Sequence, residues 1–593
     1  MRIVLLIAAA SVLLAGCQSG QPDDLDAFLA GYDILYRDLW RLAEGARWDA
    51  NVDIGDAASA ARIAAEKEFA EKLGNAELIL TAQEFLKRDG LSFEQRKQLE
   101  YVLLNAAKFP GTIPETTTAL IEAEAAQNER LYGFEFSVQL PGEAPRAVTA
   151  NEIATGLTGA PDPAARRAWW EASKEIGPSL REGLLQLRDL RNETAGSMGY
   201  SSFFALEVSE YGLTPREMID LMDEVLAGLM PLYRQLHCWV RHELAARYGE
   251  PVPRRLPAHW LGNRWAQAWP GIVEGIDLDA LVADKTPEWL ITQAERYYTS
   301  MGFPPLPAGF WENSDLYAVG ADSERKKNTH ASAWHIDLDQ DVRSLMSVEP
   351  TFDWLQTTHH ELGHVYYYLA YSNPDVPFVL RTGANRAFHE GIGTLIELVS
   401  SQTSYLRMID LLGEDEQIDH IQWLLNQALL GPVTFLPFAC GTMTHWEHDF
   451  YEEPLPADQM NARWWRYVGE YQGVAPPEPR GEEWCDAATK THISDDPAQY
   501  YDYALSSVVL HQLHDHICRE ILHEAPQTAT YYKRPEVGAY LREILRPGAT
   551  RDWRELMVEA TGGPLSSRAM LEYYQPLREW LEEQNAGRDV TFD

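Results

Sequence analysis

The sequence has 593 residues, of which 45% are hydrophobic and 23% charged, values that are ordinary for a globular protein. Asp and Glu number 89 against 50 Lys and Arg, so the formal net charge is −39. This balance argues against nucleic acid and anionic membrane surfaces as partners, because both favour basic patches. It does not identify a substrate, and a soluble surface of like charges accounts for it equally well.

The first residues are typical of an export signal. A short basic start is followed by an apolar run that ends at Leu14-Ala15-Gly16-Cys17. The run is too short to span a bilayer permanently, but it has the length of a signal-peptide core. The last four residues resemble a bacterial lipobox, which implies cleavage before Cys17 and acylation of its thiol. An ordinary signal peptide with an incidental cysteine is the alternative.

We therefore expect residues 1–16 to be a lipoprotein signal peptide and residues 17–24 to be a polar tether. Gln18 after the cysteine, rather than Asp, is compatible with sorting to an outer membrane. The expected location is that of an exported bacterial lipoprotein, on the periplasmic side of the outer membrane or at the cell surface. Its membrane contact would be the N-terminal lipid.

Helical periodicity dominates the rest of the chain. Apolar residues recur at helical spacing, for example at Leu35, Leu39 and Leu42, and few stretches alternate as strands do. Proline and glycine clusters predict the loops between helices; they lie at residues 109–114, 139–145, 250–257, 303–309, 475–480 and 561–564. Without a repeat or a long linker, residues 25–593 are predicted to form a single, mainly α domain.

The remaining cysteines show no metal-ligand spacing. Cys238, Cys440, Cys485 and Cys518 are scattered, so core packing is the default role for each, and no disulfide pairing can be read from the sequence. A better metal site is His360-Glu361-Leu362-Gly363-His364. Histidines at i and i+4 share a helix face and can bind one ion, while the intervening Glu361 can act as general base toward water. Two structural histidines on a packed helix remain the alternative.

A catalytic zinc site needs a third protein ligand. Glu390 is the preferred candidate, although the adjacent His389 is an alternative. The segment also contains Gly391 and Gly393, each of which costs a helix about 1 kcal/mol relative to alanine. Close approach of this segment to the histidine helix would account for them.

The segment 359–367, with Gly383-Ala384-Asn385 and Phe388-His389-Glu390, closely resembles the angiotensin-converting-enzyme family of zinc peptidyl-dipeptidases. Further matches follow in the family's order, and together they cover nearly the whole mature chain; they lie at residues 256–269, 330–334, 435–438, 471–473, 490–492 and 500–503. The resemblance implies a large, two-lobed helical zinc peptidase with a deep central active-site groove. It also implies short peptides as substrates, with release of C-terminal dipeptides.

By residue match, the resemblance assigns one Zn²⁺ per chain to His360, His364 and Glu390, and activation of water to Glu361. It assigns stabilisation of the oxyanion to His492 and Tyr503. His330 and the backbone of Ala331 and Ala333 would bind the peptide groups of the substrate. Gln267, Lys490 and Tyr500 would bind its C-terminal carboxylate. Gln267, Lys490 and Tyr500 matter most for specificity. They would bind the carboxylate two residues beyond the scissile bond, so the released product is a dipeptide.

The sequence departs from the family at several positions. Thr394 replaces an Asp that orients a ligand histidine; its hydroxyl can still accept a hydrogen bond, but without charge. The positions matched to chloride-binding arginines are Gly196, Val468 and Asp502, so no chloride site is expected. Ser507 replaces an aromatic residue of the terminal side-chain pocket.

Two other functions remain open. A zinc carboxypeptidase would release single C-terminal residues, which the Gln267, Lys490 and Tyr500 set argues against. A non-catalytic peptide-binding lipoprotein would have no need of the intact metal and oxyanion residues.

Overall fold

The computed structural model describes residues 24–592 except for 274–277, 321, 322, 324, 414, 416, 417 and 454. The proposed signal peptide, Cys17 and nearly all of the tether lie outside the described residues. Within them the chain is mainly α-helical with a few short strands, as predicted. The proline- and glycine-rich stretches lie between helices or overlap their ends, as 303–309 does with the first two residues of α13.

The helices of the first half are α2 (Leu25–Val52), α3 (Asp56–Leu73), α4 (Ala76–Leu86), α5 (Phe93–Ala106), α6 (Pro114–Tyr132), α7 (Ala150–Gly159), α8 (Pro163–Ala172), α9 (Gly177–Met198), α10 (Phe203–Val208), η1 (Ser209–Tyr211), α11 (Pro215–Tyr248), η2 (Ala258–Trp260), η3 (Asp279–Leu281), α12 (Pro287–Ser300) and α13 (Ala308–Asn313). Those of the second half are α14 (Phe352–Tyr371), η4 (Phe378–Leu380), α15 (Arg386–Ser400), α16 (Thr403–Met408), α17 (His420–Leu430), α18 (Pro432–Leu436), η5 (Pro437–Met443), α19 (Thr444–Glu452), α20 (Met460–Tyr471), η6 (Ala487–Thr489), α21 (Thr491–Asp495), α22 (Tyr501–His516), η7 (Ile517–Leu522), α23 (Pro535–Leu545), η8 (Gly548–Thr550), α24 (Trp553–Thr561), α25 (Arg568–Tyr573) and α26 (Gln575–Gln584). The strands are β1 (Phe136–Val138), β2 (Arg146–Val148), β3 (Leu256–Pro257), β4 (Asp315–Tyr317), β5 (Ser332–His335), β6 (Val342–Val348) and β7 (Val474–Ala475).

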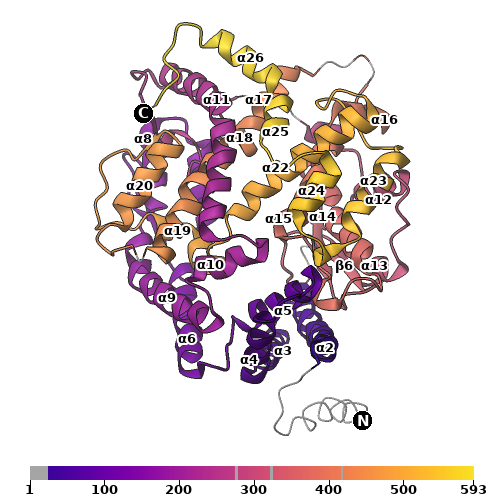
Figure 1. Ribbon diagram of the computed structural model, residues 1–593. Helices are drawn as coiled ribbons and strands as arrows, with labels where there is room; N and C mark the ends of the chain where they lie inside the picture. The colour runs from indigo at the N-terminus through magenta and orange to yellow at the C-terminus, as the bar shows by residue number, and fades with distance from the viewer. Residues whose placement is uncertain are drawn as a thin grey trace.

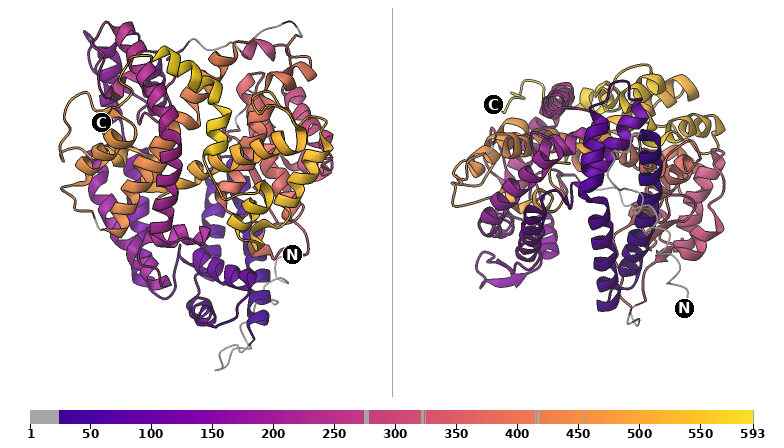
Figure 2. Two further views of the ribbon diagram at one scale, coloured as in Figure 1. Left: turned by 45° about the horizontal axis from the view of Figure 1, so that its top comes forward. Right: turned by 60° about the horizontal axis from the view of Figure 1, so that its bottom comes forward.

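Two groups of helices stand side by side in Figure 1. Helices α6 to α11 with α19 and α20 form the left group, and α12 to α16 with α23 form the right group, while α22 runs between them. The N-terminal helices α2 to α5 lie across the lower end, as the right view of Figure 2 also shows. One large apolar core includes buried residues of both groups, such as Leu229 of α11 and Leu362 of α14.

A small sheet and two packed helices position the residues of interest. The sheet has the order β4-β6-β5, with β5 antiparallel to β6 in the register Ala333 to Ser344. Helix α14 packs against both this sheet and α15, and α15 packs in turn against α22.

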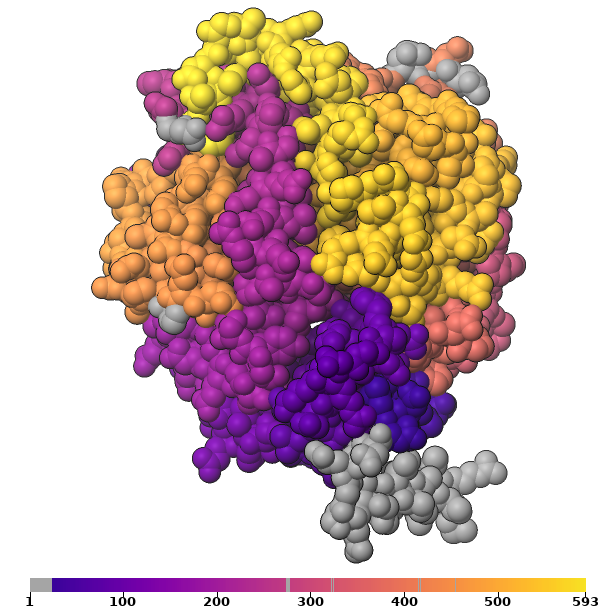
Figure 3. Space-filling model, in the orientation of Figure 1, coloured from indigo at the N-terminus to yellow at the C-terminus, as the bar shows by residue number. Residues whose placement is uncertain are grey.

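A cavity of about 250 Å³ is lined by residues of α5, Tyr211 and the segment 551–554, near the opening between the indigo and magenta segments in Figure 3.

One continuous helical stretch, His420–Glu452, is long and apolar enough to cross a membrane by length and composition alone. However, 67% of its most apolar window is buried inside the protein, as in the core helix of a soluble domain.

Candidate metal centre

Helix α14 places the two histidines of the metal motif on one face. The helix begins after Thr351, whose side chain accepts a hydrogen bond from the Trp354 backbone N–H at 3.3 Å, and it ends at Tyr371. The sequence predicts a helix that starts after Pro350-Thr351 and ends at Asn373-Pro374, and both boundaries are confirmed. The preceding His359 is not part of the cluster, because its ring is buried between the Leu355 carbonyl and the Tyr405 hydroxyl.

Helix α15 approaches α14 closely because both helices have a glycine at the contact. A Cβ atom on Gly363 would lie 2.9 Å from the Gly393 Cα, and a Cβ on Gly393 would lie 3.0 Å from the His360 Nε2. The role predicted for the glycines is therefore confirmed for Gly393. Gly391 has a different neighbour, since its Cβ would lie 3.2 Å from the Ser506 carbonyl oxygen on α22.

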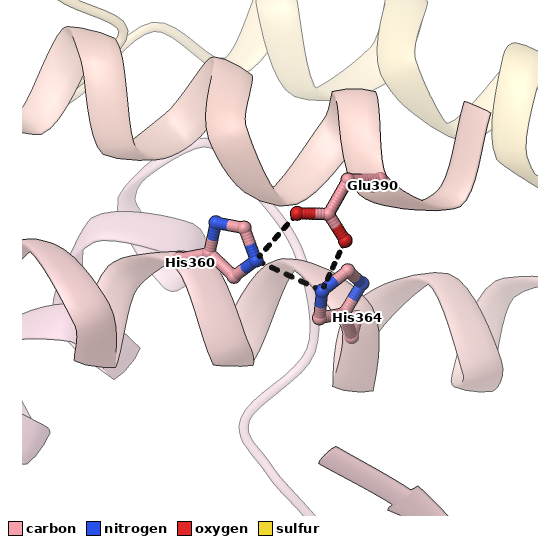
Figure 4. A group of neighbouring side chains, drawn as sticks. All are labelled: His360, His364 and Glu390. Atoms are coloured by element: carbon pink, nitrogen blue, oxygen red, sulfur yellow. Dashed lines mark hydrogen bonds and ion pairs between the residues drawn. The ribbon is translucent and has the colours of Figure 1, made fainter. Parts of the chain in front are cut away.

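His360, His364 and Glu390 present their ligand atoms to one another (Figure 4). The two histidine Nε2 atoms are 3.0 Å apart, and the Glu390 carboxylate oxygens lie 3.6 Å from the His360 Nε2 and 3.8 Å from the His364 Nε2. All three side chains are partly exposed, so the cluster can be reached from solvent. Two imidazoles and one carboxylate are a donor set of catalytic zinc sites.

Glu361 lies beside the cluster in the manner expected of a base. Its side chain is 7% exposed, and its Oε2 atom is buried without a hydrogen-bond partner. Burial raises the pKa of Glu361 to about 7. The negative charges of Glu390 and Glu397 add to this increase, and the charge of His360 opposes it. An orphaned carboxylate oxygen with such a pKa suits proton transfer near neutral pH. The donor set and the free oxygen both fit a zinc site.

The Nδ1 atoms of both histidines, which face away from the cluster, also have polar partners. The His360 Nδ1 is 3.0 Å from the Glu397 Oε2, and the His364 Nδ1 is 2.7 Å from the His389 Nδ1. His389 therefore lies behind a ligand and is not in the three-residue cluster, which decides the alternative left open by the sequence. The Thr394 hydroxyl donates to the Glu390 carbonyl oxygen at 3.0 Å, and the Nδ1 atoms of both histidines have other partners, so Thr394 orients neither ring.

The three residues assigned to the substrate carboxylate converge on one atom. The Lys490 Nζ donates to the Gln267 Oε1 at 3.1 Å, and the Tyr500 hydroxyl donates to the same oxygen at 3.2 Å. Lys490 and Tyr500 are each 4% exposed, and the Lys490 Nζ lies 4.4 Å from the Trp265 ring centre. Burial lowers the pKa of Lys490 to about 7, opposed by Asp495. The ammonium group has no carboxylate hydrogen-bond partner among the described residues.

His492 and Tyr503 lie together next to this trio. The ring centres of His492 and Tyr503 are 6.1 Å apart, and each ring contacts Tyr500, at 5.2 and 5.3 Å. Burial raises the pKa of Tyr503; Arg386 opposes the shift, and the charge of Glu390 adds to it. The phenol is therefore within electrostatic range of the metal cluster and keeps its proton at neutral pH.

The edge of β5 that faces away from β6 lies against α14. The Ser344 backbone N–H points to the Ser314 hydroxyl on the far side of β6, so its partner Ala333 directs its own backbone groups away from β6. The Ala333 carbonyl accepts instead from the Tyr368 hydroxyl of α14 at 3.3 Å. Ala331, two residues earlier, is partly buried, and His330 is exposed with its Nδ1 atom 2.8 Å from the Ala331 carbonyl oxygen.

Asp502 is paired with a cation and a phenol. Its carboxylate accepts from the Tyr211 hydroxyl at 2.6 Å and lies 3.5 Å from the Arg386 Nε. At the second position matched to a chloride ligand, Val468 lines a cavity of about 10 Å³, with room for about one water molecule, together with Lys174 and Arg264. At the third, nothing lies within 4 Å of a Cβ built on Gly196.

The smaller departures have simple outcomes. Ser507 donates its hydroxyl hydrogen to the Tyr503 carbonyl oxygen at 3.1 Å. The four described cysteines are buried and free, in agreement with the core-packing default.

The sequence missed Glu397 and Arg386 as neighbours of the site. Glu397 follows Glu390 by two helical turns, so helical spacing could have indicated it. No local pattern points to Arg386, because its partners Asp496 and Asp502 lie in a distant segment.

Comparison with known proteins agrees with this geometry. The sequence model of peptidase family M2, described as angiotensin-converting enzyme, matches residues 20–592. The angiotensin-converting enzyme of Mesocricetus auratus is 34% identical over 437 residues, which cover 70% of this chain and 32% of that protein. For the enzyme of Bos taurus the values are 35%, 437 residues, 70% and 33%.

The angiotensin-converting enzyme of Theromyzon tessulatum is 30% identical over 438 residues, covering 70% of this chain and 69% of that protein. The chain spans about a third of the length of the two mammalian relatives. Since the family match extends over nearly the whole chain and the helical fold and His-His-Glu cluster agree with it, the protein belongs to the angiotensin-converting enzyme family.

Proposed function

We propose that the protein is a zinc-dependent peptidyl-dipeptidase that hydrolyses short peptides and releases C-terminal dipeptides. Family membership supports a peptidase. The observation that carries the finer assignment is the convergence of Lys490 and Tyr500 on the Gln267 Oε1 atom. Lys490 is buried there beside neutral polar groups, without a carboxylate hydrogen-bond partner in the part of the chain that the structure describes. A free peptide C-terminus supplies the missing charge.

His360, His364 and Glu390 would hold the zinc ion, which, when bound, supplies Lewis-acid activation of a carbonyl and of water. The protein groups do the rest. Glu361 removes a proton from the attacking water and passes it to the leaving amine, a role that its buried, unpartnered oxygen permits. Tyr503 and His492 donate hydrogen bonds to the oxyanion that develops on the carbonyl.

Binding of the peptide backbone is assigned to β5. Ala333 directs its backbone groups away from β6, where its carbonyl accepts from the Tyr368 hydroxyl, and Ala331 lies just before the strand. An extended peptide can add to such an edge as a further strand. His330 would contact the same part of the substrate.

Mass spectrometry of the products from an N-terminally blocked tetrapeptide tests the proposal. We expect a dipeptide as the first product, together with one zinc per chain by elemental analysis. A single released residue would instead show a carboxypeptidase. A purified, folded protein that binds peptide without cleaving it would be a non-catalytic peptide-binding lipoprotein.

The location is a separate proposal, which rests on Leu14-Ala15-Gly16-Cys17. Acylation of Cys17 would tether the enzyme to a membrane without involving the catalytic body. We expect Cys17→Ser to move the protein from the membrane fraction to a soluble or unprocessed form with unchanged activity. Unchanged fractionation would show that the lipobox is accidental.

A further inference from the structure

The two metal-binding histidines have their hydrogen positions fixed by geometry. In each ring the Nε2 atom faces the cluster, so a metal-binding imidazole must carry its hydrogen on Nδ1. The hydrogen-bond partner of each Nδ1 atom therefore determines how strongly the orientation of that ring is fixed. These partners are Glu397 for His360 and His389 for His364.

The two partners differ in charge and in burial. Glu397 is a carboxylate with 37% of its side chain exposed. His389 is an imidazole buried against the rings of Tyr367 and Tyr368, at 4.7 and 4.9 Å, and its Nε2 atom has no hydrogen-bond partner. A charged acceptor makes the stronger hydrogen bond and also increases the electron density on the imidazole.

Residue 394 does not provide this support. Its hydroxyl donates to the Glu390 carbonyl oxygen of its own helix at 3.0 Å, and the Nδ1 atom of each histidine has another partner. Glu397 lies three residues further along α15 and, with Glu390, on the face of that helix that meets α14. One helix thus supplies both a ligand and the support of another ligand.

We propose that Glu397 is the positioning residue of the metal centre, holding the His360 ring in its metal-binding orientation through the Nδ1–H in place of a carboxylate at residue 394. The inference rests on the proposed zinc function. Partners of this kind contribute about 10- to 100-fold to metal affinity. His389, which offers only a neutral acceptor, holds the other histidine.

Zinc binding to purified Glu397→Ala tests this, with the dissociation rate measured by a chelator chase and the affinity by competition. We expect zinc to leave about 10- to 100-fold faster than from the wild-type protein. Glu397→Gln retains an oxygen that can accept from the His360 Nδ1–H, so it should recover part of the loss. This graded rescue separates positioning from a general effect on the fold.

Thr394→Ala is the matched control, because it removes a side-chain hydrogen bond from the same helix without touching either histidine. It should release zinc at the wild-type rate, and thermal unfolding with chelator present should be alike for the three variants. The electronic spectrum of the Co²⁺ form should change in Glu397→Ala and remain unchanged in Thr394→Ala.

The possible results distinguish a failure of the Glu397 positioning role from a failure of the proposed zinc peptidase function. If the wild-type protein binds one zinc and Glu397→Ala releases it within twofold of the wild-type rate, the positioning role is wrong and the peptidase proposal stands. If the wild-type protein binds no zinc, the proposed function itself fails.

Discussion

The three metal ligands come from two helices that follow one another in the chain, α14 and α15, whereas Gln267 lies 223 residues from Lys490 and 233 from Tyr500, with which it hydrogen-bonds. The first group is fixed by helix spacing and one glycine contact. The second depends on segments that only the complete fold brings together. On the proposed function, the catalytic chemistry and the length of the released product thus depend on separate parts of the molecule, and each can be perturbed without the other.

The largest effect should follow from removing the base in the first group. Glu361→Gln should lower kcat by about 10²- to 10⁴-fold, the usual contribution of general base catalysis. Glu361 is not a proposed zinc ligand, so the metal should stay bound. Zinc content, by elemental analysis, should remain at one per chain. His364→Ala should lose both metal and activity. Near-normal turnover in the Glu361 variant would contradict the assignment.

Amidation of the peptide C-terminus perturbs only the second group. Lys490 would then be left buried without an anionic partner, which costs about 2–4 kcal/mol, or about 30- to 700-fold in kcat/KM. The comparison needs steady-state kinetics on an acid and amide peptide pair. Lys490→Gln is the control, since it should abolish most of the discrimination between the two. Equal rates for acid and amide with the wild-type enzyme would remove the carboxylate assignment.

A change at the helix contact perturbs the first group through packing. In Gly393→Ala the new methyl group would meet the His360 ring at about the 3.0 Å found for an ideal Cβ, so the ring or the helix must move. We expect a loss of about 1–3 kcal/mol in stability, with weaker zinc binding. Thermal unfolding with and without zinc measures both. Gly196→Ala, with nothing within 4 Å of its Cβ, should be neutral or stabilising.

The pH dependence of substrate binding should report on Lys490. Its pKa is lowered to about 7, chiefly by burial, so the charged form is lost as the pH rises through that value. We expect KM for a peptide with a free carboxylate to rise above about pH 7, by about tenfold per pH unit at most. An amidated peptide should not show the rise, and Lys490→Arg should shift it to higher pH.

The smallest effect concerns the junction between the two groups, where Arg386 at the start of α15 meets Asp502 at the start of α22. The Asp502 carboxyl group already lies between Arg386 and the Tyr211 hydroxyl and contacts both, so this position has no room for a further anion. Replacing chloride by acetate at constant ionic strength should therefore change activity little. A several-fold activation specific to chloride would contradict this and would direct attention to Lys174 in the cavity beside Val468.

The sequence predicted those parts of the site that follow from spacing along a helix. The i, i+4 histidines and the start of α14 after Thr351 needed only local rules, and the glycines of α15 indicated its close approach to α14. Residue match to the family, and not spacing, brought Gln267 to Lys490. The contact of Gly391 with α22 and the pairing of Arg386 with Asp502 depend on how distant helices pack, which a single sequence does not specify.

If a substrate pairs with β5 as proposed, the edge of that strand also determines the conformation in which the peptide must bind. A peptide that pairs with this edge has to be straightened, and each residue that is ordered costs about 1–2 kcal/mol of conformational entropy. Short, unstructured peptides lose only that entropy, whereas a folded hormone or a disulfide-closed loop would first have to unfold its tail. Proline at a pairing position would also lack the N–H that the strand's carbonyl requires. On the proposed binding mode, the edge of β5 therefore favours unstructured peptides whatever their side chains.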